Sequence, residues 1–80
     1  HMALIVLMED DAGTRTLIAS VLKKDGHEVL AAENGAQGLM LVEARRPDLV
    51  ISDVQMPELN GFQMLAALRQ NPDIAATPVI

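Results

Sequence analysis

The chain has 80 residues, half of them hydrophobic, with no cysteine and a net charge of −5. This length suits one small domain, and the lack of cysteine excludes a disulfide framework and a thiolate metal site. The basic residues are scattered and only one residue is aromatic, so we expect no nucleic-acid binding by this chain. Its apolar runs are too short to cross a membrane, and we expect a soluble cytoplasmic protein.

The first predicted strand is an apolar run from about Ala3 to Met8 that ends in Glu9-Asp10-Asp11. The run is too short for a helix and indicates a strand buried on both faces. Asp11 is a favoured N-cap residue for a helix over about residues 12–24. Arg15 is taken as a solvated charge. The predicted buried residues of this helix are Leu17, Ile18, Val21 and Leu22.

A shorter and more polar strand is predicted over about residues 28–32, and its polarity places it at a sheet edge. Asn34 and Gln37 resemble a capping box for a second helix over about residues 35–45. Pro47 disfavours helical geometry at Arg46 and so ends that helix. The predicted buried residues of this helix are Ala36, Leu39, Met40 and Ala44.

The central stretch of the chain is the apolar run from Leu49 to Asp53, which indicates a third strand buried on both faces. Pro57 and Asn60-Gly61 interrupt the chain before a third helix over about residues 61–70. That helix is predicted to bury some of Phe62, Leu65, Ala66 and Leu68. The segment Thr77-Pro78-Val79-Ile80 predicts the start of a fourth strand.

Strands and helices alternate in the order βαβαβαβ, which predicts an α/β fold with a parallel sheet and right-handed crossovers. The carboxyl ends of parallel strands share the sheet edge where ligands bind. Glu9, Asp10 and Asp53 meet at that edge only if the first and third strands are neighbours. The sequence therefore predicts a doubly wound, flavodoxin-like sheet of order 2-1-3-4, incomplete at its fourth strand.

These motifs together resemble the receiver domain of two-component response regulators, of the chemotaxis-regulator type. The matching pieces are the strands ending in Glu9-Asp10 and in Asp53, Met56-Pro57-Glu58-Leu59-Asn60-Gly61, and Thr77-Pro78-Val79-Ile80. The resemblance covers essentially the whole chain. It implies that Asp53 accepts a phosphoryl group from a sensor histidine kinase or a phosphotransfer protein.

The resemblance also implies a Mg²⁺ site. Asp10, Asp53 and the backbone carbonyl of Gln55 correspond to its ligands, and Glu9 corresponds to a second acid that acts on the metal through water. Asp11 matches no ligand. The residue types suit this chemistry, because gathered carboxylates repel one another and a hard cation relieves that repulsion. A carboxylate can also form an aspartyl-phosphate.

The sequence ends before the Ser or Thr, the Lys and the aromatic residue that receivers carry farther along the chain. We therefore expect residues 1–80 to be the N-terminal two-thirds of a receiver domain, truncated after the start of strand four and impaired in phosphorylation. An uncovered sheet face and an unpaired edge of the fourth strand predict a homo-oligomer.

Two other hypotheses stay open. The chain could be a self-associating half-fold without signalling activity, which phosphorylation assays would distinguish from a working receiver. It could also be an aspartate-nucleophile phosphatase, but such enzymes place a second aspartate two residues after the nucleophile, where Gln55 stands. We therefore expect a signalling module and not an enzyme.

Overall fold

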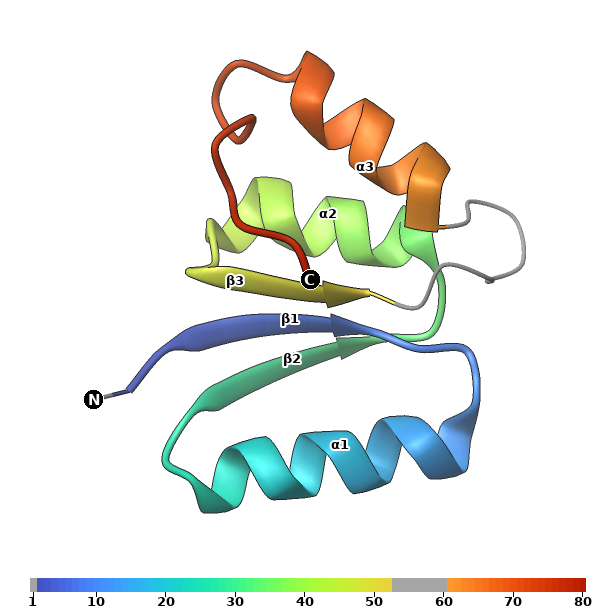
Figure 1. Cartoon of the computed structure of the whole chain (residues 1–80), viewed down its shortest axis with the longest axis vertical. Helices are drawn as coiled ribbons and strands as arrows, with labels where there is room; N and C mark the ends of the chain where they lie inside the picture. Colours follow the sequence, from blue (N-terminus) through green and yellow to red (C-terminus); the bar gives the residue numbers. More distant parts are fainter. Residues whose placement is uncertain (1, 53–60) are drawn as a thin grey trace.

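The computed structural model describes residues 2–52 and 61–80. In these residues a parallel sheet of three strands alternates with three helices. The elements are β1 (Leu4–Met8), α1 (Ala12–Lys24), β2 (Glu28–Ala32), α2 (Gly35–Arg45), β3 (Leu49–Ser52) and α3 (Gly61–Gln70). The strand order is β2-β1-β3, and Figure 1 shows α1 on one side of the sheet with α2 and α3 on the other. The predicted doubly wound α/β fold is confirmed.

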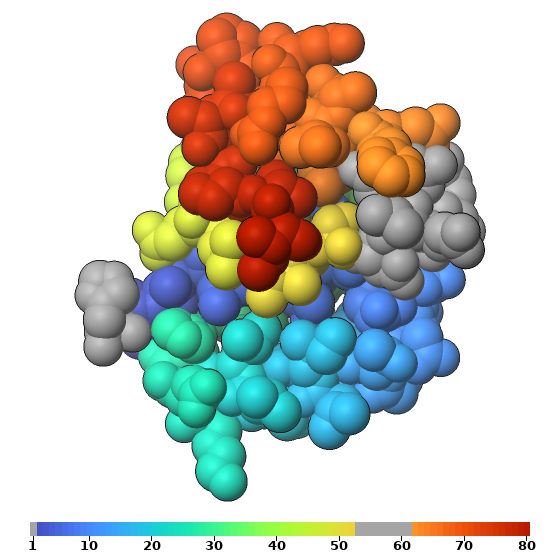
Figure 2. Space-filling view, in the orientation of Figure 1, coloured from blue at the N-terminus to red at the C-terminus, as the bar shows by residue number. Residues whose placement is uncertain are grey.

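The predicted fourth strand is present as a single parallel bridge between Val50 and Val79. The Val50 N–H donates to Pro78 O at 2.8 Å, and the Ile80 N–H donates to Val50 O at 2.9 Å. The Ser52 N–H donates to Ile80 O at 3.0 Å. Because β1 occupies the other edge of β3, this segment lies at the far side of β3, which confirms the order 2-1-3-4. The space-filling view shows it at the surface beside β3 (Figure 2).

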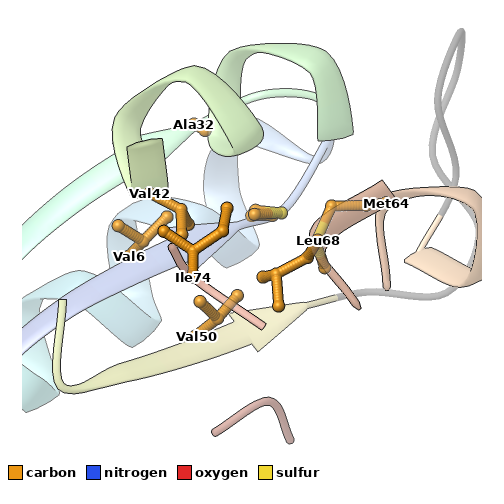
Figure 3. Close-up of a cluster of buried hydrophobic side chains, with 8 residues drawn as sticks. Val6, Ala32, Val42, Val50, Met64, Leu68 and Ile74 are labelled. Atoms are coloured by element: carbon orange, nitrogen blue, oxygen red, sulfur yellow. The ribbon is translucent and has the colours of Figure 1, made fainter. Parts of the chain in front are cut away.

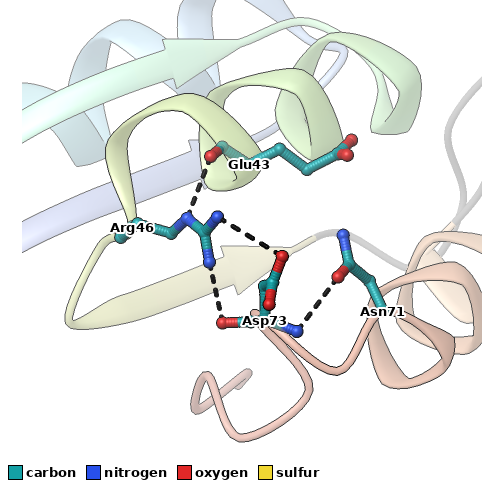
Figure 4. A network of polar contacts seen from close by, with 4 residues as sticks. All are labelled: Glu43, Arg46, Asn71 and Asp73. Carbon is teal, nitrogen blue, oxygen red and sulfur yellow. Dashed lines mark hydrogen bonds and ion pairs between the residues drawn. The ribbon is translucent and has the colours of Figure 1, made fainter.

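Arg46 and Arg69 bind the backbone of residues 71–77, which connect α3 to residues 78–80. The guanidinium of Arg46 donates to Glu43 O at 3.0 Å and to Asp73 O at 2.8 Å (Figure 4). Arg69 Nη1 donates to Ala75 O and, at 2.8 Å, to Thr77 O. These contacts place the segment so that residues 78–80 can pair with β3.

The helix ends follow the signals in the sequence. Asp11 Oδ2 accepts a hydrogen bond from the Thr14 N–H and Asn34 Oδ1 from the Gln37 N–H, both at 2.8 Å. Arg46 ends α2 as a C-cap with a left-handed φ of 50°, and Pro47 disfavours continuation of the helix through Arg46. None of the described helices is long and apolar enough to cross a membrane.

The larger hydrophobic core lies between the sheet and the pair α2 and α3 (Figure 3). Its buried residues are Val6, Met8, Ala32, Val42, Val50, Met64, Leu68 and Ile74. On the opposite face, β1 buries Ile5 and Leu7 beneath α1. Both faces of β1 are therefore covered, as its continuous apolar run predicts.

The predicted buried face of α2 is wrong at Ala36, Met40 and Ala44, and right only at Leu39, which packs against the core. Met40 is 70% exposed and both Ala36 and Ala44 are exposed, whereas Leu39 is half-buried. The residues of α2 that are buried are Gly35, Gly38 and Val42. The reason is that small residues allow a helix to approach a sheet closely, so the face that carries the glycines packs inward. An ideal Cβ at Gly38 would lie 2.5 Å from Met8 Cγ.

The predictions for α1 and α3 are partly right. In α1, Ile18 and Leu22 are half-buried, but Leu17 and Val21 are 65% and 54% exposed, and the buried residue is Ala19. In α3, Leu68 is buried and Leu65 half-buried as predicted, whereas Phe62 and Ala66 are exposed and Met64 is buried. The spacing of apolar residues therefore identified both helices but predicted only some of the residues on their buried faces.

Candidate functional site at the carboxyl ends of the strands

The three strands end at the same level of the sheet. The register pairs Met8 of β1 with Ala32 of β2 and with Ser52 of β3. Glu9 extends this edge, because its N–H donates to Ala32 O at 3.0 Å. Strands one and three are thus neighbours, as the placement of the acids requires. The predicted phospho-acceptor Asp53 and the predicted carbonyl ligand Gln55 lie outside the described residues.

The three acids that follow β1 have different local roles. Glu9 Oε2 accepts a hydrogen bond from the Asp11 N–H at 3.0 Å, and the Asp11 carboxylate caps α1 through the Thr14 N–H. Asp10 is exposed, and in residues 2–52 and 61–80 no hydrogen bond or ion pair engages its carboxylate. Asp11 is therefore the cap that the sequence predicted, and Asp10 carries the carboxylate that remains available for a ligand.

The carboxylate of Asp11 contributes a negative charge at this end of the sheet. Hydrogen bonds from the Thr14 backbone N–H and hydroxyl hold the pKa of Asp11 below its usual value, and the nearby positive charge of Arg15 lowers it further. Asp11 is therefore ionised at neutral pH. Glu9, Asp10 and Asp11 together make the edge a place where a cation is attracted.

Arg15 is a residue of this site that sequence reasoning missed. It is half-buried rather than fully solvated, and its Nη1 donates to the Glu9 backbone carbonyl at 2.9 Å. A signal was present in the sequence, since Arg15 falls early in a helix that follows three acids. A cation near a helix N-terminus is disfavoured by the helix dipole and needs such a compensating partner.

The donor atoms at this edge fit a hard divalent cation. Glu9 and Asp10 supply carboxylate oxygens, which Mg²⁺ prefers as protein ligands. Within the described ranges no three His, Cys, Asp or Glu residues gather closely enough to hold a metal. The predicted ligand set also includes Asp53 and Gln55, which stand outside those ranges.

A parallel sheet of order 2-1-3-4, in which acids directly follow β1 at the carboxyl ends of the strands, defines a flavodoxin-like α/β domain. The sequence profile of the response regulator receiver domain matches residues 5–80. The chain therefore belongs to the response regulator receiver family, whose members are signalling domains of two-component systems.

Relatives and solved structures agree with this assignment. The chain is 40% identical to the protein PilH of Pseudomonas aeruginosa over 79 residues, which is 99% of this chain and 65% of PilH. It is 36% identical to the transcriptional regulatory protein AfsQ1 of Streptomyces coelicolor, covering 91% of this chain and 32% of AfsQ1. The chemotaxis response regulator CheY4 of Vibrio cholerae superposes with a TM-score of 0.92 at 32% identity, covering 99% of this chain and 66% of CheY4. The chain thus spans slightly less than two thirds of PilH and of CheY4.

Proposed function

We propose that this chain is the phospho-acceptor receiver of a two-component response regulator, with Asp53 as the acceptor and Mg²⁺ as its cofactor. The observation that carries this proposal is the exposed Asp10 carboxylate, which no described residue binds, at the edge where β1 and β3 end side by side. Asp53 directly follows Ser52, the last residue of β3. A phospho-acceptor and a metal ligand are thus expected at one edge of one sheet.

Each residue of the proposed site has a distinct role. The Asp53 carboxylate attacks the phosphorus of the donor, an acyl phosphate forms, and the bond from phosphorus to the leaving group breaks. Asp10, Asp53 and the Gln55 carbonyl would hold Mg²⁺, which when bound neutralises charge on the transferring phosphoryl group. The hydrogen bond from the Asp11 N–H to the Glu9 carboxylate supports an indirect role for Glu9, through water.

The phosphoryl donor is inferred from the family. Receiver domains interact with histidine kinases or phosphotransfer proteins, and we infer such a partner for this chain, in the cytoplasm. We also infer that residues 1–80 form the N-terminal two-thirds of a receiver domain, in keeping with the 65% of PilH that they span. The chain acts in this proposal as a signalling module and not as an enzyme.

The proposed metal site predicts a saturable response to Mg²⁺ in the native chain. Amide NMR signals of residues 9–11 are expected to shift during a Mg²⁺ titration, and Asp10→Asn is expected to remove most of the response because the amide lacks the ligand charge. Asp25→Asn is the matched control, since Asp25 caps the C-terminus of α1, at the other end of the helix from Asp11. Equal responses in the native chain and in Asp10→Asn would refute the metal site.

We also propose that the 80-residue chain self-associates. The sheet face on the side of α1 is incompletely covered, because α1 packs on β2 and β1 and leaves Leu49 and Ile51 of β3 half-exposed. Leu17 and Val21 are exposed on α1, and Ile80 is 73% exposed beside β3. Apolar surfaces of this kind favour association with a second copy, and so does the outer edge of residues 78–80, which pairs with no other strand among the described residues.

Sedimentation velocity at micromolar concentration is expected to show a dimer or a larger assembly. Leu17→Glu combined with Val21→Glu is expected to shift the chain toward monomer if the α1 face is buried, and to leave the assembly intact if strand edges pair instead. Met40→Glu, on the exposed side of α2, is the control and is expected to have no effect. A cooperatively folded native monomer at all concentrations would show that the chain does not self-associate.

A further inference from the structure

Three consecutive peptide groups at the end of β1 are each held by a different partner. The N–H of the Met8–Glu9 peptide donates to Ala32 O at 3.0 Å. The carbonyl of the Glu9–Asp10 peptide accepts from Arg15 Nη1 at 2.9 Å. The N–H of the Asp10–Asp11 peptide donates to Glu9 Oε2 at 3.0 Å. The backbone on both sides of the Asp10 Cα is therefore held, while the Asp10 carboxylate is exposed.

Arg15 occupies a position that is unfavourable for a positively charged side chain. It is the fourth residue of α1, close to the positive end of the helix dipole, where a cation is disfavoured. Its half-buried guanidinium also gives up side-chain entropy to remain in place. The hydrogen bond to the Glu9 carbonyl and the attraction to the Asp11 carboxylate offset these costs. The result is a link between α1 and the backbone that carries Asp10.

We propose that Arg15 is a positioning residue for the metal-binding carboxylate of Asp10. It acts through the Glu9–Asp10 peptide group, whose orientation sets the direction in which the Asp10 side chain leaves the backbone. This role rests on the proposed metal site. Holding the backbone that carries Asp10 limits the directions in which its exposed carboxylate can point, which favours cation binding. Loss of a partner that bonds a metal ligand weakens metal binding about 10- to 100-fold, and because Arg15 bonds the backbone and not the carboxylate, we expect the lower end of that range.

The test is the Mn²⁺ affinity of Arg15→Met, measured by water-proton relaxation on the folded chain. This substitution removes the hydrogen-bond donor and keeps an unbranched apolar side chain, and we expect affinity to fall about tenfold. The direction of the change is diagnostic. If Arg15 acted only through its charge, removing a cation beside the acids would strengthen Mn²⁺ binding. Unchanged or tighter binding would therefore overturn the positioning role.

Lys24→Met is the matched control, because it removes the same charge from the other end of α1. Its Mn²⁺ affinity is expected to equal that of the native chain. Equal losses in Arg15→Met and Lys24→Met would overturn the role of Arg15, since the loss would then not depend on the hydrogen bond to Glu9.

A measurement without metal separates the role of Arg15 from the metal site itself. Amide hydrogen exchange at Asp11 is expected to be faster in Arg15→Met than in the native chain, because the turn that holds this N–H against Glu9 loosens. Exchange at Gln37, whose N–H is held by the Asn34 side chain at the start of α2, is expected to be unchanged. An amide exchange rate at Asp11 that is the same in Arg15→Met as in the native chain would overturn the role of Arg15. No saturable Mn²⁺ binding by the native chain would instead overturn the metal site, and the exchange result would still decide what Arg15 does.

Discussion

Asp53→Asn is expected to abolish phosphoryl transfer to this chain from a small donor such as acetyl phosphate. The native Asp53 carboxylate displaces acetate from the phosphorus and forms an acyl phosphate. The asparagine amide is a poor nucleophile, so no comparable bond forms. The measurement is intact-protein mass spectrometry after incubation with donor and Mg²⁺, followed by mapping of the modified residue. We expect a low yield in the native chain and none in the variant.

The control for this experiment is Asp25→Asn, which makes the same chemical change at the C-terminal cap of α1, at the other end of that helix from the acids that follow β1. It is expected to be labelled as the native chain is. Labelling of Asp10 while Asp53 is intact would refute Asp53 as the acceptor, and so would full labelling of Asp53→Asn. Absence of labelling in the native chain would favour the alternative hypothesis of a half-fold without signalling activity.

Gly38→Val is expected to have the largest effect on stability. A Cβ at this position would lie 2.5 Å from both Cγ and Sδ of Met8, and Met8 is fully buried in the core. Met8 cannot turn into solvent to make room, so either its side chain or α2 must move. Overpacking a closed core costs about 1–3 kcal/mol, occasionally more. The free energy of unfolding from urea denaturation measures this loss.

Gly13→Val is the matched control for Gly38→Val. Gly13 is exposed in α1, and a Cβ there would meet only Asp11 Oδ2, at an ordinary contact distance of 3.5 Å. We expect this variant to be as stable as the native chain or slightly more stable, because valine is favoured over glycine in a helix. Equal losses at the two positions would show that the close approach of α2 to β1 does not limit the side chain at Gly38.

The close packing at Gly38 also connects the core to the proposed site. Met8 is the last residue of β1, and Glu9 and Asp10 follow it directly. Displacing Met8 therefore moves the backbone that carries the Asp10 carboxylate. We expect Gly38→Val to disturb the amide signals of Glu9 and Asp10.

Local signals in the sequence were sufficient to predict the helices and strands and their order along the chain. Asp11 and Asn34 cap helices because a short polar side chain can bond the N–H three residues later, whatever the rest of the fold is. Pro47 ends α2 through a clash with the residue before it. Short apolar runs marked the strands, and the acids that end two of them required β1 and β3 to be neighbours, which they are.

Only the tertiary structure decided which side of each helix is buried and how the three acids divide their roles. In α2, Ala36, Met40 and Ala44 face outward, because the side of the helix that carries Gly35, Gly38 and Val42 packs on the sheet and its glycines allow a close approach there. The sequence could not rank Asp10 above Glu9 as a free carboxylate, since that depends on hydrogen bonds within a folded turn. It also could not place Arg15 on the Glu9 carbonyl. Caps and turns depend on neighbours along the chain, whereas burial and side-chain pairing depend on distances between elements that exist only after the sheet and helices have packed.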